Sequence, residues 1–462
     1  MGSPRRQLSE TNYHSKKQST HKGKYMHTFK NFKNFKQIDI DLSNPMTLLI
    51  GRNGSGKSNI IEGVILLAEL IKGKELNDFS DIGRGGQCEI RGGVDGCFRH
   101  GCDSFELGFK DTIVFKKKEQ KISFQISASN KLNIKVKKKA LLGDKDLLDL
   151  LPTINKDLKT FSEKDILLLA GLFGGLGLIS AEDKGLKAIG SFIAGLSIIE
   201  AINQNNKQKE LPGQNKSDYS RLLKKYNKIC IFDILPRKLR YYNPKGEKVL
   251  NPNGSNLSSV IYDLDQNQPE ILNNILKLIR QLPEEPFEQF EFIETSDDKE
   301  VLFALKNQNG ETIKANLLSD GTLRAIAILT ALETIPEGSR TIIEEIDNGI
   351  HSSRVNLLID EIWKICNRRH LNTLITTHNP STLDSLTIDQ LKCVLLTHYD
   401  KKSNSARLTP FFELPDVDIL LQKDKLGGLV TRNVIERYLD PDFHREQKSI
   451  ALQSLKRLES IK

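Results

Sequence analysis

One glycine-rich segment limits the folds open to this chain more than any other feature. Residues 51–58 read Gly-Arg-Asn-Gly-Ser-Gly-Lys-Ser, and they follow an apolar run at 46–50 that is typical of a buried strand. From Ser58 to Lys72 apolar residues recur every three or four positions, as on one face of a helix. In a strand–loop–helix unit of this kind, backbone N–H groups wrap phosphate oxygens and the helix N-terminus attracts negative charge. The segment therefore predicts a P-loop, with Lys57 on the phosphates and Ser58 on Mg²⁺.

An acidic strand end supports this prediction. Residues 341–347 read Thr-Ile-Ile-Glu-Glu-Ile-Asp, an apolar run that ends in carboxylates. Beside a P-loop, one carboxylate can hold Mg²⁺ and the next can orient the attacking water, as phosphoryl transfer requires. We therefore expect Glu344 to bind the metal and Glu345 to act as the general base. Without a P-loop in the chain, a solvated sheet edge would be the better interpretation.

Two further segments follow in an order that favours function. Ser319, Asp320 and Gly321 open an apolar helix, where a hydroxyl and free N–H groups form a second phosphate receptor. His378 follows a strand that ends at 375–377, where it could hydrogen-bond a γ-phosphate oxygen. Each alone would fit an ordinary helix cap or a structural histidine, but together with the P-loop they favour one catalytic set.

The four motifs in this order resemble the RecF/SMC-like branch of ABC ATPases, over roughly residues 26–140 and 225–400. The signature LSDGTLR and the N-G-x-H element at 348–351 are similar to its compact prokaryotic group. This resemblance implies ATP and Mg²⁺ as ligands, and a homodimer or higher homo-oligomer whose heads sandwich ATP. Lys57, Ser58, Glu344, Glu345 and His378 would act within one protomer, while Ser319, Asp320 and Gly321 would reach across from the other. The other nucleotide contacts that it implies are Asn53, Gly54, Ser55, Gly56 and Asn59.

Two positions depart from the family pattern. The metal-binding acidic residue is usually Asp, and here Glu344 takes its place, which favours slower turnover. The Q-loop, whose glutamine is a further metal ligand, has no clear counterpart. Gln87 is the candidate, and a plain surface glutamine is the alternative.

Within this branch the layout looks like the ATPase subunits of antiphage defence systems, such as PtuA-type subunits of Septu and their PARIS and retron-associated relatives. This similarity implies a sensor-regulator that controls a separately encoded effector, an HNH-type nuclease in Septu-like systems. A RecF-like repair or recombination ATPase that binds DNA directly is the alternative, and a slow nucleotide-dependent scaffold is a third. The chain lacks coiled-coil heptads, which favours the first of these. The Asp-x-Asp segment at 416–418 lies in a loop-like context with little chain after His378, so we expect no intrinsic nuclease domain.

The expected fold is α/β, an ABC-type P-loop ATPase head with an antiparallel β lobe, a parallel α/β lobe and a helical insertion. The boundaries that we predict are a disordered basic arm at 1–25 (native or appended), the head at 26–142 and 223–430, the helical insertion and linker at 143–222, and a C-terminal helical segment at 431–462. Apolar stretches at 166–179 and 188–199 are too short to span a membrane. They form either an oligomerisation surface, which we favour, or a buried helical hairpin.

Periodicity predicts the elements of the head. They are a strand at 32–42, short meander strands at 89–94, 104–109, 112–117, 121–127 and 132–137, a strand at 228–235, a helix at 268–282, and a hairpin of 288–295 with 301–307 and an Asn-Gly turn at 309–310. From 317 to 378 helix and strand alternate, which predicts a parallel sheet with helical crossovers.

The formal net charge of the 462 residues is +9, which favours polyanionic partners. A possible DNA-backbone track, or alternatively a plain solvated face, consists of the lysine runs at 116–118 and 135–139 with Lys224, Lys225, Arg237, Lys238 and Arg240. The chain shows no secretory signal and its six cysteines form no dense framework, so we expect the cytoplasm. Cys88, Cys97, His100 and Cys102 lack the spacing of a structural zinc site, so we expect reduced thiols.

Overall fold

The computed structural model describes most of the expected head. The described residues are 25–71, 74–82, 88–115, 118–129, 134–142, 145–146, 229–281, 287–440 and the pairs 442–443, 445–446, 449–450 and 452–453. The predicted arm before residue 25, nearly all of the predicted insertion and most of the last twenty residues lie outside them.

Five parallel strands form one half of a sheet that has twelve strands in the described part of the chain. In spatial order they are β10 (Ile229–Phe232), β15 (Arg340–Ile343), β16 (Asn372–Thr376), β3 (Met46–Ile50) and β17 (Val394–Asp400). Every residue of β3 and β15 is buried, as expected for parallel strands that are covered on both faces. The predicted alternation of helix and strand from 317 to 378 is therefore confirmed.

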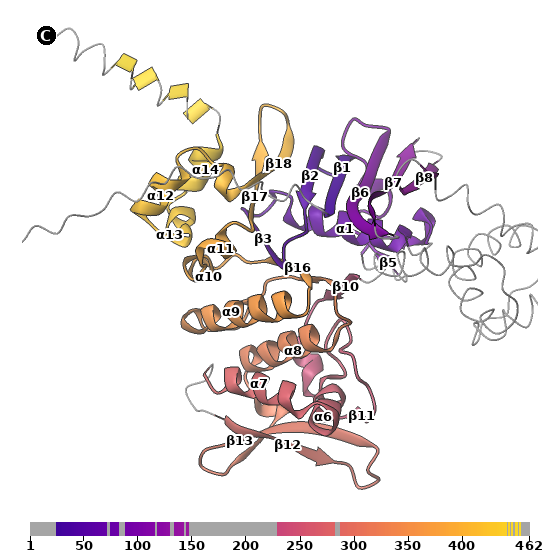
Figure 1. Cartoon of the computed structure of the whole chain (residues 1–462), viewed down its shortest axis with the longest axis vertical. Helices are drawn as coiled ribbons and strands as arrows, with labels where there is room; N and C mark the ends of the chain where they lie inside the picture. The colour runs from indigo at the N-terminus through magenta and orange to yellow at the C-terminus, as the bar shows by residue number, and fades with distance from the viewer. Residues whose placement is uncertain are drawn as a thin grey trace, which may run out of the picture.

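The other half of the sheet is antiparallel and continues from β17 (Figure 1). Its strands are β18 (Ser405–Pro410), β2 (Phe35–Asp41), β1 (Tyr25–Phe32), β6 (Ser104–Phe115), β7 (Lys118–Ser129), β8 (Lys135–Leu142) and β9 (Lys145–Asp146). Only the contact of β18 with β2, through Ala406 and Phe35, is parallel within this half. The expected division into an antiparallel β lobe and a parallel α/β lobe is confirmed.

Three sequence predictions are wrong in detail. The strand predicted at 32–42 begins only at Phe35, because Asn31 and Lys33 have φ of +49° and +51° and turn β1 back into β2. The strands predicted separately at 104–109 and 112–117 are one strand, β6. No strand covers 89–94, apart from the end of the two-residue β5 (Cys88–Glu89), which pairs with β4 (Phe79–Ser80).

Helices cover the two faces of the sheet. Helix α1 (Lys57–Ile71) packs on the antiparallel side, while α8 (Asp320–Thr334) and α9 (Ser352–Arg368) lie under the parallel strands, followed by α7 (Pro269–Ile279) and α6 (Leu257–Asn267) (Figure 1). The predicted helix at 268–282 is α7, and α6 was not predicted. The short helices after β16 are α10 (Pro380–Asp384), α11 (Ile388–Leu391), α12 (Val417–Lys423), α13 (Leu426–Thr431) and α14 (Val434–Leu439). Asp416 caps α12 and Asp418 lies in its first turn, so this pair begins a helix and not a loop.

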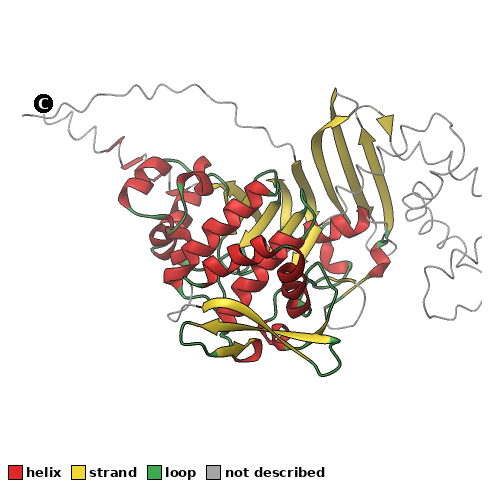
Figure 2. Cartoon of the chain, turned by 60° about the horizontal axis from the view of Figure 1, so that its bottom comes forward, coloured by secondary structure: helices red, strands yellow, loops and turns green. Residues whose placement is uncertain are grey.

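A second, smaller sheet closes the far side of α6 and α7 (Figure 2). It consists of β11 (Asn243–Pro244), β12 (Phe287–Glu294), β13 (Glu300–Asn307) and β14 (Thr312–Lys314). The predicted hairpin of β12 with β13 is confirmed, but the Asn309-Gly310 turn joins β13 to β14. Short 3₁₀ turns complete the head at η1 (Leu76–Asp78), η2 (Asp95–Cys97), η4 (Pro236–Arg240), η5 (Ala315–Leu317) and η6 (Phe411–Glu413).

The large sheet separates two hydrophobic cores. Along β3, Leu48 and Ile50 join the core under α8 and α9, whereas Leu49 joins the core under α1. This alternation follows from the two-residue period of a strand. The central position of β3 between the cores fixes the point where the P-loop leaves the sheet.

The described residues contain no helix long and apolar enough to cross a membrane, and no cluster of three possible metal ligands. Cys97 and Cys102 are free thiols, and burial raises the pKa of Cys97 to about 12.

Candidate functional site

The P-loop joins the carboxyl end of β3 to the first turn of α1, as the sequence predicts. Gly51 and Gly56 have φ of +153° and +114°, and a Cβ on Gly51 would lie 2.3 Å from the carbonyl oxygen of Thr397. The Ser55 hydroxyl contacts the Thr397 hydroxyl, which anchors the loop to β17. At the tip, Asn53 and Gly54 are exposed, while Ser58 is half-buried in the first turn of α1. Glycine is thus required where the loop passes directly over a neighbouring strand.

Lys57 is held inside this loop. Its ammonium donates to the carbonyl oxygens of Gly51 and Arg52, the second at 3.0 Å. Burial lowers the pKa of Lys57 to about 8, and the nearby Glu345 carboxylate partly opposes this shift. The side chain is therefore an ammonium at neutral pH that points into the loop, where a phosphate would be held.

The two glutamates after β15 occupy different environments. Glu344 is half-buried, and its pKa is raised first by burial and then by the negative charge of Asp233. Glu345 is exposed and has φ of +47°, and its N–H donates to the Thr376 hydroxyl at 3.0 Å. An excess of negative charge around a half-buried carboxyl is the environment that a divalent cation neutralises. Glu344 is therefore one oxygen ligand suited to Mg²⁺, although the described residues hold no cluster of three such side chains.

The end of β16 brings the predicted histidine to the same edge. Burial lowers the pKa of His378, and Lys57 lowers it further, while Glu345 acts in the opposite direction. The strands β15, β16 and β3 are neighbours in the sheet, and carboxyl ends of parallel strands meet at one edge, so the segments that carry Glu345, His378 and Lys57 follow adjacent strand ends. The hydroxyls of Thr377 and Thr382 both donate to the buried Asp347 carboxylate, which ties the β16 end to the acidic turn.

The signature segment at 318–322 exposes two polar side chains to solvent. Ser319 caps α8, with its hydroxyl accepting the Thr322 N–H at 3.1 Å, and both Ser319 and Asp320 are exposed. Arg240 donates to the carbonyl oxygens of Asn316 and Leu318 at 2.8 and 2.9 Å and pairs with Asp320. Among the described residues, no hydrogen bond or ion pair joins Ser319 or Asp320 to the P-loop. Arg240, which belongs to the possible DNA track named above, is thus bonded to this segment.

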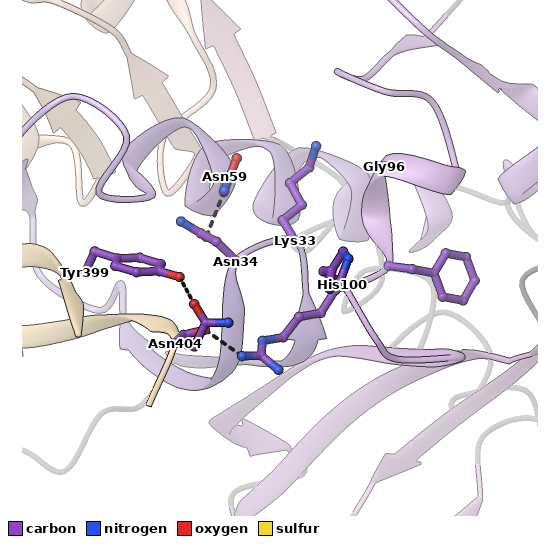
Figure 3. Close-up of a pocket in the computed structure, with 9 residues that line it drawn as sticks. Lys33, Asn34, Asn59, Gly96, His100, Tyr399 and Asn404 are labelled. Carbon is purple, nitrogen blue, oxygen red and sulfur yellow. Dashed lines mark hydrogen bonds between the residues drawn. The ribbon is translucent and has the colours of Figure 1, made fainter. Parts of the chain in front are cut away.

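A cavity of about 390 Å³ lies between the β1–β2 hairpin, Asn59 at the start of α1 and the β17–β18 hairpin, and no residue of 51–58 lines it (Figure 3). Asn34 of that hairpin accepts a hydrogen bond from Asn59 of α1 at 2.8 Å, and its amide nitrogen would lie 3.2 Å from a Cβ on Gly56. On the opposite side, Tyr399 and Asn404 of the β17–β18 hairpin are hydrogen-bonded to each other. The cavity thus presents an aromatic ring and several amides next to the phosphate loop.

Sequence reasoning missed Asn34, Tyr399 and Asn404. For Asn34 the sequence does offer a signal. Asn34 precedes Phe35, an apolar residue of a strand before the P-loop, and Phe35 packs directly against Gly56. Tyr399 and Asn404 offer none, because sheet order alone brings them to the same cavity as Asn34 and Asn59. The predicted metal ligand Gln87 lies outside the described residues.

Two family models match the chain. Residues 218–384 match "AAA domain, putative AbiEii toxin, Type IV TA system", and residues 28–231 match "AAA domain". The DNA replication and repair protein RecF of Gloeobacter violaceus is 43% identical over 54 residues, which cover 12% of this chain and 14% of RecF. The chromosome partition protein Smc of Methanocaldococcus jannaschii is 40% identical over 55 residues, which cover 12% of this chain and 5% of Smc. The matched segments are thus a small part of these relatives.

Solved SMC heads are among the similar structures. A SMC head bound to the C-winged helix domain of ScpA aligns at a TM-score of 0.44 and 10% identity, over 83% of this chain and 96% of that one. The SMC head domain from Thermotoga maritima aligns at 0.38 and 13%, over 83% and 97%. The P-loop, the strand order and these sequence matches support a P-loop ATPase of the RecF/SMC kind.

Proposed function

We propose that this chain is an ATP-hydrolysing switch whose nucleotide is enclosed between two protomers and whose state controls a separate effector. The observation that carries this proposal is the strand order, which brings the ends of β15, β16 and β3, followed by Glu345, His378 and the P-loop, to one edge, while Ser319 is exposed and makes no hydrogen bond to the P-loop among the described residues. One chain therefore supplies the phosphate loop and the base, and a second copy supplies the signature hydroxyl.

Each residue has a role in hydrolysis. Lys57 neutralises the β- and γ-phosphates, and Glu345 takes a proton from the water that attacks the γ-phosphorus in line. Because its pKa is lowered, His378 is neutral at pH 7 and hydrogen-bonds the γ-phosphate without adding charge. Ser58 and Glu344 would hold Mg²⁺, with Gln87 as a further proposed ligand, and the ion supplies charge neutralisation on the phosphates.

The proposed partner is a separately encoded nuclease in an antiphage system, in a homodimer or higher homo-oligomer. The description of the matching family model, a putative AbiEii toxin of a type IV toxin–antitoxin system, supports a role in such conflict systems. Co-expression with the product of the neighbouring gene tests this role. We expect a stable complex that cuts plasmid DNA with ATP altering the rate, whereas this chain alone leaves the plasmid intact. Failure to capture any partner, together with DNA-end processing by this chain alone, would contradict it.

A RecF-like role in DNA repair is the second candidate, and the outer face of the antiparallel half favours it. Lys135, Lys137 and Lys139 of β8 are exposed on one face of the strand, and Lys121 of β7 is exposed on the same face. Such a face suits a sequence-independent contact with phosphates. Replacing the three β8 lysines by Gln should reduce the slope of log Kd against log salt by about 3. An unchanged slope would show that DNA does not bind at this face.

A further inference from the structure

A buried arginine fastens the signature helix to the acidic turn of its own protomer. Arg324 lies one turn into α8 and is 6% exposed. Its guanidinium donates to the carbonyl oxygens of Ile234 and Glu344, both at 2.8 Å, and of Glu345 at 3.2 Å. A planar guanidinium has five N–H donors and can serve several carbonyl groups at once, whereas an ammonium on a shorter stem cannot reproduce this fork.

A second contact joins the same two segments. A Cβ on Gly321 would lie 2.2 Å from the carbonyl oxygen of Gly349, so the first turn of α8 rests directly on the turn after Asp347. That turn is closed by hydrogen bonds from Asn348 N–H to Glu345 at 3.0 Å and from Ile350 N–H to Asp347 at 3.1 Å. The helix start and the acidic turn therefore pack as one unit.

The residue held by Arg324 is conformationally unusual. Glu345 has φ of +47°, in the left-handed region that side chains other than glycine seldom adopt. Its backbone is kept there by the Thr376 hydroxyl on its N–H, and by Asn348 and Arg324 on its carbonyl oxygen. Loss of the arginine would let this backbone relax, and the carboxylate would move with it.

We infer that Arg324 is a positioning residue that couples the signature end of α8 to the carboxylate of Glu345. This inference rests on the proposed function, in which Ser319 docks on the nucleotide of the partner while Glu345 acts on the nucleotide of its own chain. Movement of α8 on docking at one site is then transmitted to the base at the other site. The two sites of the dimer hydrolyse ATP in a coupled manner.

Arg324→Lys tests the coupling, with Arg369→Lys as the matched control. Arg369 donates to the carbonyl oxygen of Leu332 at the other end of the same helix, away from the acidic turn. For Arg324→Lys we expect kcat to fall about 10- to 100-fold with KM within about twofold, because a base displaced by about 1 Å loses this much rate. We also expect the ATP dependence to lose its cooperativity, while Arg369→Lys retains both.

Two further measurements keep the test decisive. The fluorescence of Trp363, the single tryptophan of the sequence, on helix α9 beside α8, reports whether each variant folds. If Arg324→Lys does not fold, Thr376→Val, which removes the hydroxyl that accepts the Glu345 N–H, should show the same fall in kcat with ATP binding retained. Folded variants with unchanged kcat and cooperativity would overturn the inference.

Hydrogen exchange separates this inference from the proposed function. Amides of residues 344–350 should exchange faster in Arg324→Lys than in Arg369→Lys, even without nucleotide. If Glu345→Gln hydrolyses ATP like the unmodified chain, the proposed function fails, but the exchange rates still decide whether Arg324 positions the turn. Equal exchange in the two variants would overturn the positioning role.

Discussion

The phosphate loop and the signature segment are built in opposite ways. At the phosphate loop, Lys57 is bonded to the loop's own carbonyl oxygens, and the segments of Glu345 and His378 follow the two neighbouring strands. At the signature segment, Ser319 and Asp320 are exposed to solvent. Arg240 donates to the Leu318 carbonyl oxygen, and Arg324 of helix α8 donates to that of Glu344. One chain therefore completes the first half of a nucleotide site and displays the second half. This difference supports our proposal that a second copy completes the site.

Removal of the Lys57 ammonium from the phosphate loop should reduce ATP affinity more than any other substitution that we propose. For Lys57→Ala we expect ATP affinity to fall at least about 100-fold, because charge-assisted bonds to the phosphates are each worth about 1.5–3 kcal/mol. Calorimetric titration with ATP measures this change. Ser319→Ala is the matched variant in the second half, and it should leave ATP binding by a single protomer unchanged. Equal losses of ATP affinity in Lys57→Ala and Ser319→Ala would contradict the distinction between the phosphate loop and the signature segment.

The lowered pKa of Lys57 predicts how ATP binding responds to pH. The ammonium loses its proton as the pH rises through about 8, well below the ordinary lysine value. Because ATP binds the charged form, its affinity should be constant below this pH and fall about tenfold for each pH unit above it. Titrations without divalent cation from pH 7 to 9.5 measure the slope. Lys57→Arg should show no slope, since arginine stays charged; a flat profile for the unmodified chain would refute the shift.

The cavity near the P-loop allows a test of where the nucleotide base binds, and we expect a smaller effect on ATP affinity than that of Lys57→Ala. If the nucleotide base stacks on Tyr399, Tyr399→Leu should weaken ATP binding about 3- to 10-fold, the usual worth of an aromatic stack. Tyr242→Leu, at an exposed tyrosine of the small sheet region, is the control and should leave binding unchanged. Inorganic triphosphate should bind both variants equally. Equal weakening of ATP and triphosphate binding would place the base elsewhere.

Contiguous patterns account for what could be predicted from the sequence. The unit from Met46 to Ile71 is a strand, loop and helix in succession, and each part is encoded by its own residues. The Ser319 cap and the strand ends at Glu344 and His378 are likewise local features. For this reason these candidate residues could be selected from the sequence, and the strand order brings the ends of β15, β16 and β3 to one edge.

Contacts between distant segments could not be predicted. The anchor of the P-loop joins Ser55 to Thr397, which are 342 residues apart, and Arg324 reaches Ile234 across 90 residues. The bonding partner of Arg240 could not be predicted either. Its place in a basic run predicted a role on the surface, but its guanidinium is bonded to the signature segment. Charge in a sequence does not reveal which partner each side chain meets.

The native mass of Glu345→Gln with and without MgATP tests the central claim most directly, since loss of the base should trap the enclosed nucleotide. We predict that ATP increases the mass by pairing protomers, and that Ser319→Arg in the same background abolishes this increase while ATP affinity is retained. A mass that is independent of ATP, or an increase that survives Ser319→Arg, would contradict a nucleotide site shared between two copies of this chain.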